Sequence, residues 1–128
     1  MTSPSPGQIA RFLQNQYDAG EEAYLYVLTD LMKAQYDAIE DARFVLQLDC
    51  PDLARRRHAI FAHVPLEEFR QIIAMHVETL NDAVGDIRPD DIRMHICWAG
   101  TMGPHHTDVP LKDIGEIRFV EVRVWADY

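Results

Sequence analysis

A chain of 128 residues with 48% hydrophobic and 26% charged residues has the size and composition of one globular domain, residues 1–128, which argues against a second folding unit. Twelve Lys and Arg against twenty-one Asp and Glu give a net charge of −9, which disfavours a nucleic-acid partner. No apolar run reaches the ~20 residues of a membrane span, and residues 1–7 lack the pattern of a signal peptide, so we expect a cytoplasmic protein without membrane contact.

The first half of the chain predicts a loosely ordered start, a helix and a strand. Residues 1–8 are rich in Pro and Ser and are expected to be loosely ordered. Apolar side chains recur at three- and four-residue steps over residues 21–42, which predicts a long amphipathic helix. Residues 44–48 predict a short buried strand, which Asp49 and Pro51 end. The helix face expected to be buried consists of Tyr24, Val27, Leu28, Leu31, Ala38, Ile39 and Ala42.

The second half predicts another helix and two more strands. The helix covers residues 66–84, and Gly85 is placed to end it. The apolar face that predicts this helix consists of Leu66, Phe69, Ile72, Ile73, Val77, Leu80 and Val84. Residues 92–97 form a strand with Arg93, His95 and Cys97 on one face, and residues 117–125 form the last strand. The alternation of strand, helix and strand predicts a βαβ unit in which residues 44–48 and 92–97 pair in parallel through a right-handed crossover.

His95 and Cys97 are the first candidates for a metal site. An imidazole and a thiolate on the same side of one strand end suit two ligands of a tetrahedral zinc ion. The same spacing also occurs where a His is satisfied by hydrogen bonds and a Cys packs as a small core residue. A reducing cytosol favours a free thiol or a metal ligand over a disulfide between Cys50 and Cys97.

The other candidate binding or metal-ligating residues lie on the predicted strands or directly after them. Asp49 stands at a strand end, where α/β folds gather ligands, so it can hold an ammonium group or cap residues 52–57. His105 and His106 lie in the loop after residue 97 and can serve as metal ligands, proton shuttles or anion contacts, although most loop histidines are none of these. Glu121 on the last strand needs a partner if it is buried, either a metal or Arg123.

Four stretches of the chain together resemble a known family. They are residues 5–10 (SPGQIA), 21–25 (EEAYL), 46–53 (LQLDCPDL) and 93–98 (RMHICW), the last continued by residues 103–111 (GPHHTDVPL). They are similar to the cobalamin-independent methionine synthase superfamily, in particular to its short bacterial members that resemble the C-terminal catalytic domain. The resemblance covers residues ~5 to ~115, which is nearly the whole chain.

The resemblance implies a fold, a cofactor and a reaction. The family fold is a (β/α)8 barrel, in which zinc activates homocysteine as a thiolate that accepts a methyl group from a folate of the 5-methyltetrahydrofolate type, in methionine biosynthesis. His95 and Cys97 match the first two zinc ligands of the family, and Glu121 is the candidate for the third. Asp49 matches the family residue beside the amino group of homocysteine.

The chain departs from this family in length and in its last segment. A complete barrel needs ~250 residues, so we expect an α/β fold that is a partial (β/α)8, TIM-barrel-like fragment with parallel strands and two long amphipathic helices. A helix of the family is replaced by residues 112–116, and the second Cys ligand has no counterpart. The chain is therefore expected to be incomplete as an enzyme and to associate with a copy of itself or a complementary barrel fragment. The alternatives are a non-catalytic module that binds zinc or a small molecule, and a structural remnant of the barrel.

Overall fold

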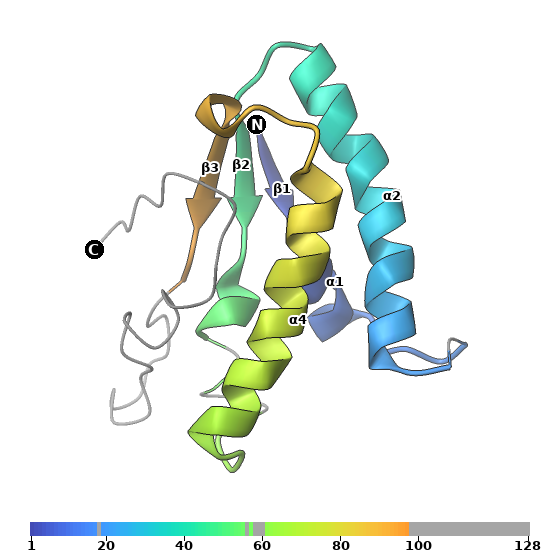
Figure 1. Ribbon diagram of the computed structural model, residues 1–128, viewed down its shortest axis with the longest axis vertical. Coiled ribbons are helices and arrows are strands. Elements are labelled where there is room, and N and C mark those ends of the chain that lie inside the picture. The colour runs from blue at the N-terminus through green and yellow to red at the C-terminus, as the bar shows by residue number, and fades with distance from the viewer. Residues whose placement is uncertain (18, 56, 58–60, 98–128) are drawn as a thin grey trace.

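The computed structural model describes residues 1–97 apart from 18, 56 and 58–60 (Figure 1). This part is a mixed α/β structure built on a small parallel sheet. Its strands are β1 (Thr2–Pro4), β2 (Leu46–Asp49) and β3 (Ile92–His95). Its helices are α1 (Pro6–Phe12), α2 (Glu21–Asp41) and α4 (Leu66–Val84), with the 3-10 turns η1 (Pro51–Leu53) and η2 (Pro89–Asp91).

The three strands lie in the order β1-β2-β3, and both pairs are parallel. The pairing of Leu46 with Ile92 and of Asp49 with His95 confirms the predicted parallel pairing of these two strands. Strand β2 begins two residues later than expected, because Phe44 and Val45 lie outside the ladder and are exposed. The strand predicted over residues 117–125 falls outside the described residues.

The expectation of a loosely ordered start is wrong. Ser3 pairs with Leu48 in the parallel ladder, so the first residues form an edge strand of the sheet. The Pro/Ser-rich sequence suits this place, because Pro4 stands at the end of an edge strand and Ser5 caps the following helix by accepting a hydrogen bond from the Gln8 backbone amide at 3.1 Å. Pro6 then occupies the first helical position, where its missing N–H costs nothing.

Helix α2 has nearly the predicted bounds but buries a different face. Val27 and Leu31, which were expected in the core, are 45% and 64% exposed. The hydroxyl of Tyr36 donates to the Pro4 carbonyl at 2.6 Å, which fixes the rotation of the helix against β1. Apolar residues surround much of this helix, so periodicity alone could not choose the face that packs. The residues that α2 buries are Leu25, Leu28, Thr29, Met32, Tyr36 and Ile39.

Helix α4 agrees with the prediction in its bounds and in its buried face. It ends before Gly85, and it buries Phe69, Ile73 and Val77 together with Leu80 and Val84. Helices α2 and α4 run side by side and cover the same face of the sheet (Figure 1). No helix in the described ranges is both long enough and apolar enough to cross a membrane.

The two faces of the sheet differ in chemistry because side chains alternate along each strand. The face under α2 and α4 contributes the core residues Leu46, Leu48, Ile92 and Met94. The opposite face carries side chains that are partly or largely exposed: Thr2, Pro4, Gln47, Asp49, Arg93 and His95. The polar face is therefore the one on which the candidate residues Asp49 and His95 lie.

Candidate functional site

The carboxyl ends of the three parallel strands meet at one edge of the sheet. Pro4, Asp49 and His95, the last residues of the strands, stand in register across this edge. Two backbone hydrogen bonds extend the pairing by one residue beyond the strand ends. The Ser5 N–H donates to the Asp49 carbonyl at 3.0 Å, and the Cys50 N–H donates to the His95 carbonyl at 2.9 Å. This hydrogen bonding fixes the positions of the side chains that follow each strand.

Asp49 and His95 form a side-chain pair at this edge. Asp49 Oδ1 lies 2.7 Å from His95 Nδ1, and the two side chains are 33% and 44% exposed. A carboxylate accepts hydrogen bonds only, so Nδ1 carries the proton, and in the neutral ring Nε2 is then the nitrogen with a free lone pair. The alternative that Asp49 caps residues 52–57 is wrong, because Cys50 is the N-cap residue of η1 and no side chain caps it.

Cys97 follows β3 on the same side as His95. Exposure alternates from half-buried His95 through buried Ile96 to half-buried Cys97, as in a continuing strand. This alternation agrees with the predicted placement of both residues on one face. Among the described residues, no group of three or more His, Cys, Asp or Glu side chains is arranged to hold a metal ion. His95 and Cys97 thus offer two donors, while Glu121, His105 and His106 lie outside the described residues.

Cys50, the other candidate thiol, belongs to the core rather than to this edge. Its side chain is fully buried in the main hydrophobic cluster. Burial, and after it the neighbouring carboxylate of Asp52, raises the pKa of the Cys50 thiol well above its ordinary value of 9.0. A thiol held neutral in an apolar core is a poor metal ligand, because ligation requires the thiolate.

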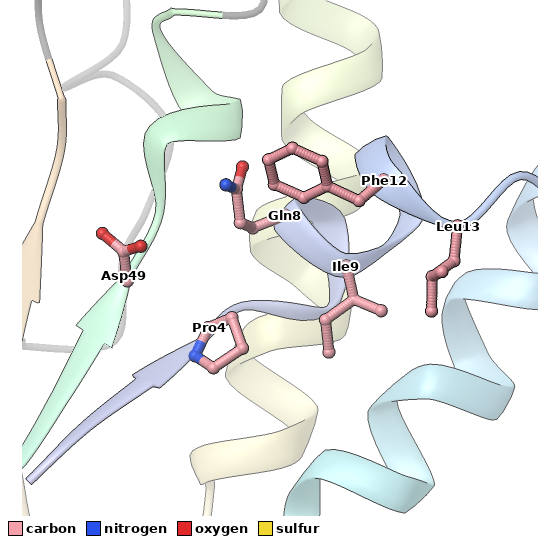
Figure 2. Close-up of a pocket in the computed structure, with 6 residues that line it drawn as sticks. All are labelled: Pro4, Gln8, Ile9, Phe12, Leu13 and Asp49. Carbon is pink, nitrogen blue, oxygen red and sulfur yellow. The ribbon is translucent and has the colours of Figure 1, made fainter.

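A pocket of about 370 Å³ opens between α1 and the ends of β1 and β2 (Figure 2). Its walls are mostly apolar, and its polar groups come from Gln8 and Asp49. Gln8 is 8% exposed, and within the described part of the chain its Oε1 is buried without a hydrogen-bond partner. An unpaired buried acceptor costs about 1–3 kcal/mol. The full set of lining residues is Pro4, Gln8, Ile9, Phe12, Leu13 and Asp49.

Beneath this edge, three side chains from distant parts of the chain form a buried polar network. Asp52 accepts a hydrogen bond from Ser5 Oγ at 2.8 Å, and its second oxygen lies 2.8 Å from His76 Nδ1. The side chains of Asp52 and His76 are each 1% exposed. The network ties the end of β1, the turn after β2 and helix α4 together. Gly7 packs against it so closely that an added Cβ would lie 2.2 Å from His76 Nδ1.

Sequence reasoning gave no role to Ser5, Gln8, Asp52 or His76, although the first three lie in the stretches 5–10 and 46–53 that carry the resemblance. A signal for His76 was present, because it falls between the apolar positions of the buried face of α4, where a polar side chain needs a partner. Nothing in the sequence indicated that this partner is Asp52, 24 residues away. For Gln8 no local pattern distinguishes a pocket-lining side chain from an ordinary residue of a short helix.

Comparison with protein-family models, with curated proteins and with solved structures finds no match to this chain. The interpretation of the site therefore depends on its geometry and chemistry together with the resemblance of the four sequence stretches given above.

Proposed function

We propose that the carboxyl edge of the sheet forms part of a zinc site in a methyltransferase that moves a methyl group from a folate of the 5-methyltetrahydrofolate type to a thiol such as homocysteine. The observation that carries this proposal is the hydrogen bond between Asp49 Oδ1 and His95 Nδ1. Histidines that bind metals commonly donate their other ring N–H to a carboxylate, which fixes the tautomer and makes the free nitrogen a better ligand. His95 is held in this way.

The donor set fits zinc. His95 contributes Nε2 and Cys97 contributes sulfur, and nitrogen and sulfur are the donors that zinc prefers in proteins. When zinc is bound, it supplies a Lewis acid that lowers the pKa of a coordinated thiol. The remaining donors would come from Glu121, His105 or His106, or from a second chain.

Asp49 can serve the histidine and the substrate at once. Its Oδ1 contacts His95 Nδ1, whereas its Oδ2 makes no hydrogen bond or ion pair with another described residue. The second oxygen can accept a hydrogen bond from the ammonium group of an amino-acid substrate. This placement would hold the amino group of the substrate beside the ring that carries the metal and so fix the distance between the substrate thiol and the zinc.

The proposed architecture is a partial (β/α)8 barrel. Helices α2 and α4 cover one face of a parallel sheet, and the other face is polar and bears the candidate site, as the interior and mouth of a barrel would. In the described ranges β1 and β3 pair on one side only, so each leaves an edge that a second copy or a complementary barrel fragment could pair. Free Cys50 and Cys97 suit a reducing compartment, which supports a cytoplasmic location.

The experiment is a measurement of zinc per chain after purification without chelator. The variants are His95→Ala and Cys97→Ala, with His63→Ala as the matched control because His63 is exposed and far from the edge in sequence. We expect about one zinc per wild-type chain, lost in the first two variants and kept in the control. Asp49→Asn should retain zinc with about 10–100-fold weaker affinity, because it removes only the carboxylate that orients the ring.

Activity separates the proposal from its alternative. The zinc-loaded protein is then assayed for methyl transfer from 5-methyltetrahydrofolate to homocysteine. Zinc without turnover would favour a non-catalytic zinc or small-molecule binding module, which the pocket beside Asp49 also suits. A wild-type protein without zinc would contradict the metal site and leave the structural-remnant interpretation.

A further inference from the structure

The buried network of Ser5, Asp52 and His76 lies next to the candidate site. All three side chains are buried in a part of the molecule that is otherwise largely apolar. Burying such groups gains little stability over well-packed apolar residues of similar volume. What a hydrogen-bonded network adds is a fixed geometry, because its bonds are directional. The network therefore fixes the relative positions of the segments that it joins.

One peptide group connects the candidate site to this network. The carbonyl of Asp49 accepts a hydrogen bond from the Ser5 N–H at 3.0 Å, and the N–H of the same peptide group, which belongs to Cys50, donates to the His95 carbonyl at 2.9 Å. The orientation of this peptide group sets a backbone torsion of Asp49, and the backbone torsions decide which side-chain rotamers are allowed. The direction of the Asp49 carboxylate therefore depends on the position of Ser5.

Asp52 and His76 fix the position of Ser5. The Ser5 hydroxyl donates to Asp52 Oδ1 at 2.8 Å and accepts from the Gln8 N–H at 3.1 Å, so it acts as donor and acceptor at once. Asp52 Oδ2 lies 2.8 Å from His76 Nδ1, so helix α4 holds the same carboxylate from its other side. This contact has room because residue 7 is glycine, since an added Cβ would lie 2.2 and 2.3 Å from its two atoms.

We infer that His76 and Asp52 are positioning residues, which act through Ser5 on the pair of Asp49 and His95. They hold the Asp49 carboxylate where it accepts the hydrogen bond from His95 Nδ1, and so they keep Nε2 of that ring free to bind a metal. The inference rests on the proposed function for the use of Nε2. The positioning itself is a property of the metal-free chain, so the two can fail separately.

The first test observes the His95 ring in the full chain treated with EDTA. Nitrogen NMR of the labelled ring distinguishes its two neutral forms, and comparison with His95→Ala assigns the signals. We expect the Nδ1–H form to predominate in the wild type, because Asp49 accepts that proton. The Nε2–H form should increase in His76→Phe and in Ser5→Ala, in which the network is broken. His76→Asn has an amide that can donate to Asp52 in place of Nδ1, so it should restore the wild-type ratio.

The second test measures the affinity for Zn²⁺ by competition with a chromophoric chelator. His76→Phe should weaken zinc binding about 10-fold, the lower end of the loss that follows removal of an outer partner of a ligand. In an Asp49→Asn background the same change should have no further effect, because His76 acts through Asp49. Val84→Ala, at the C-terminal end of α4, is the matched control. It removes buried apolar contacts, so it should lower the melting temperature and change neither the ring nor the zinc affinity.

Several outcomes would overturn the inference. A folded His76→Phe protein with the wild-type ratio of ring forms is one, and additive losses of zinc affinity in the double variant are another. Equal changes in Val84→Ala would show a general loss of stability instead of positioning. If His76→Phe does not fold, Ser5→Ala decides the inference by the same measurements. A wild-type protein without zinc would refute the proposed function alone, and the ring forms of the metal-free protein would then decide this inference.

Discussion

Replacing Gly7 with Ala should break the buried pair between Asp52 and His76. An ideal Cβ at Gly7 would lie 2.2 Å from His76 Nδ1 and 2.3 Å from Asp52 Oδ2, which are the two atoms that the 2.8 Å contact joins. Both side chains are 1% exposed, so neither can move into solvent. The added methyl group must therefore push the two partners apart inside the core.

The magnitude follows from the loss of this pair. Separating Asp52 and His76 leaves each buried polar group without this partner, at a cost of about 1–3 kcal/mol per group, and the better helix propensity of Ala offsets up to about 1 kcal/mol of the total. We expect a net loss of about 2–4 kcal/mol in the free energy of unfolding. For a chain of this length, the melting temperature should fall by about 10 °C or more.

Thermal and urea denaturation followed by circular dichroism would measure the effect. Gly20→Ala is the matched control, because nothing lies within 4 Å of a Cβ at Gly20 and its φ of 168° is extended backbone. In a His76→Ala background the same Gly7→Ala change should cost much less, since the nearest atom is gone and Asp52 can shift into the space. Equal costs in the two backgrounds, or a Gly7→Ala protein as stable as the wild type, would refute the reasoning.

Three further predictions concern the core and the sheet. Burial in the folded state raises the pKa of the Cys50 thiol well above 9.0, so as the pH rises the thiol ionises in the unfolded chain before it ionises in the folded protein. The free energy of unfolding should therefore keep its full value below about pH 9 and decrease above it. In urea denaturation measured across pH, Cys50→Ala should make this decrease smaller. Tyr36→Phe leaves the Pro4 carbonyl without its 2.6 Å hydrogen bond and should cost about 1–3 kcal/mol in thermal denaturation, whereas an unchanged melting temperature would contradict this contact. Because β1 and β3 each leave an unpaired edge in the described ranges, light scattering should detect a dimer or larger species, and a monomer at all concentrations would count against association.

The elements with strong local patterns were predictable from the sequence. Helix α4 and its buried face followed from apolar spacing, and β3 followed from a short alternating run. The placement of His95 and Cys97 on one side of a strand came from the same two-residue period. Each of these features depends on neighbours within one or two turns of the chain, and such neighbours are visible in the sequence.

Features that depend on distant contacts were decided by the tertiary structure. Strand β1 exists because it pairs with β2, and α2 buries one of its two apolar faces because Tyr36 meets the end of β1. The candidate site also depends on contacts between distant parts of the chain, because Asp49 and His95 are 46 residues apart and meet only through the parallel register of β2 and β3. Local periodicity fixes which way a side chain points from its own element, but strand pairing and helix packing decide which other side chain it meets. The sequence by itself therefore determined helices α2 and α4, two of the strands and the common face of His95 and Cys97. The tertiary structure alone decided β1 and α1, and it joined Asp49 to His95 and Asp52 to His76.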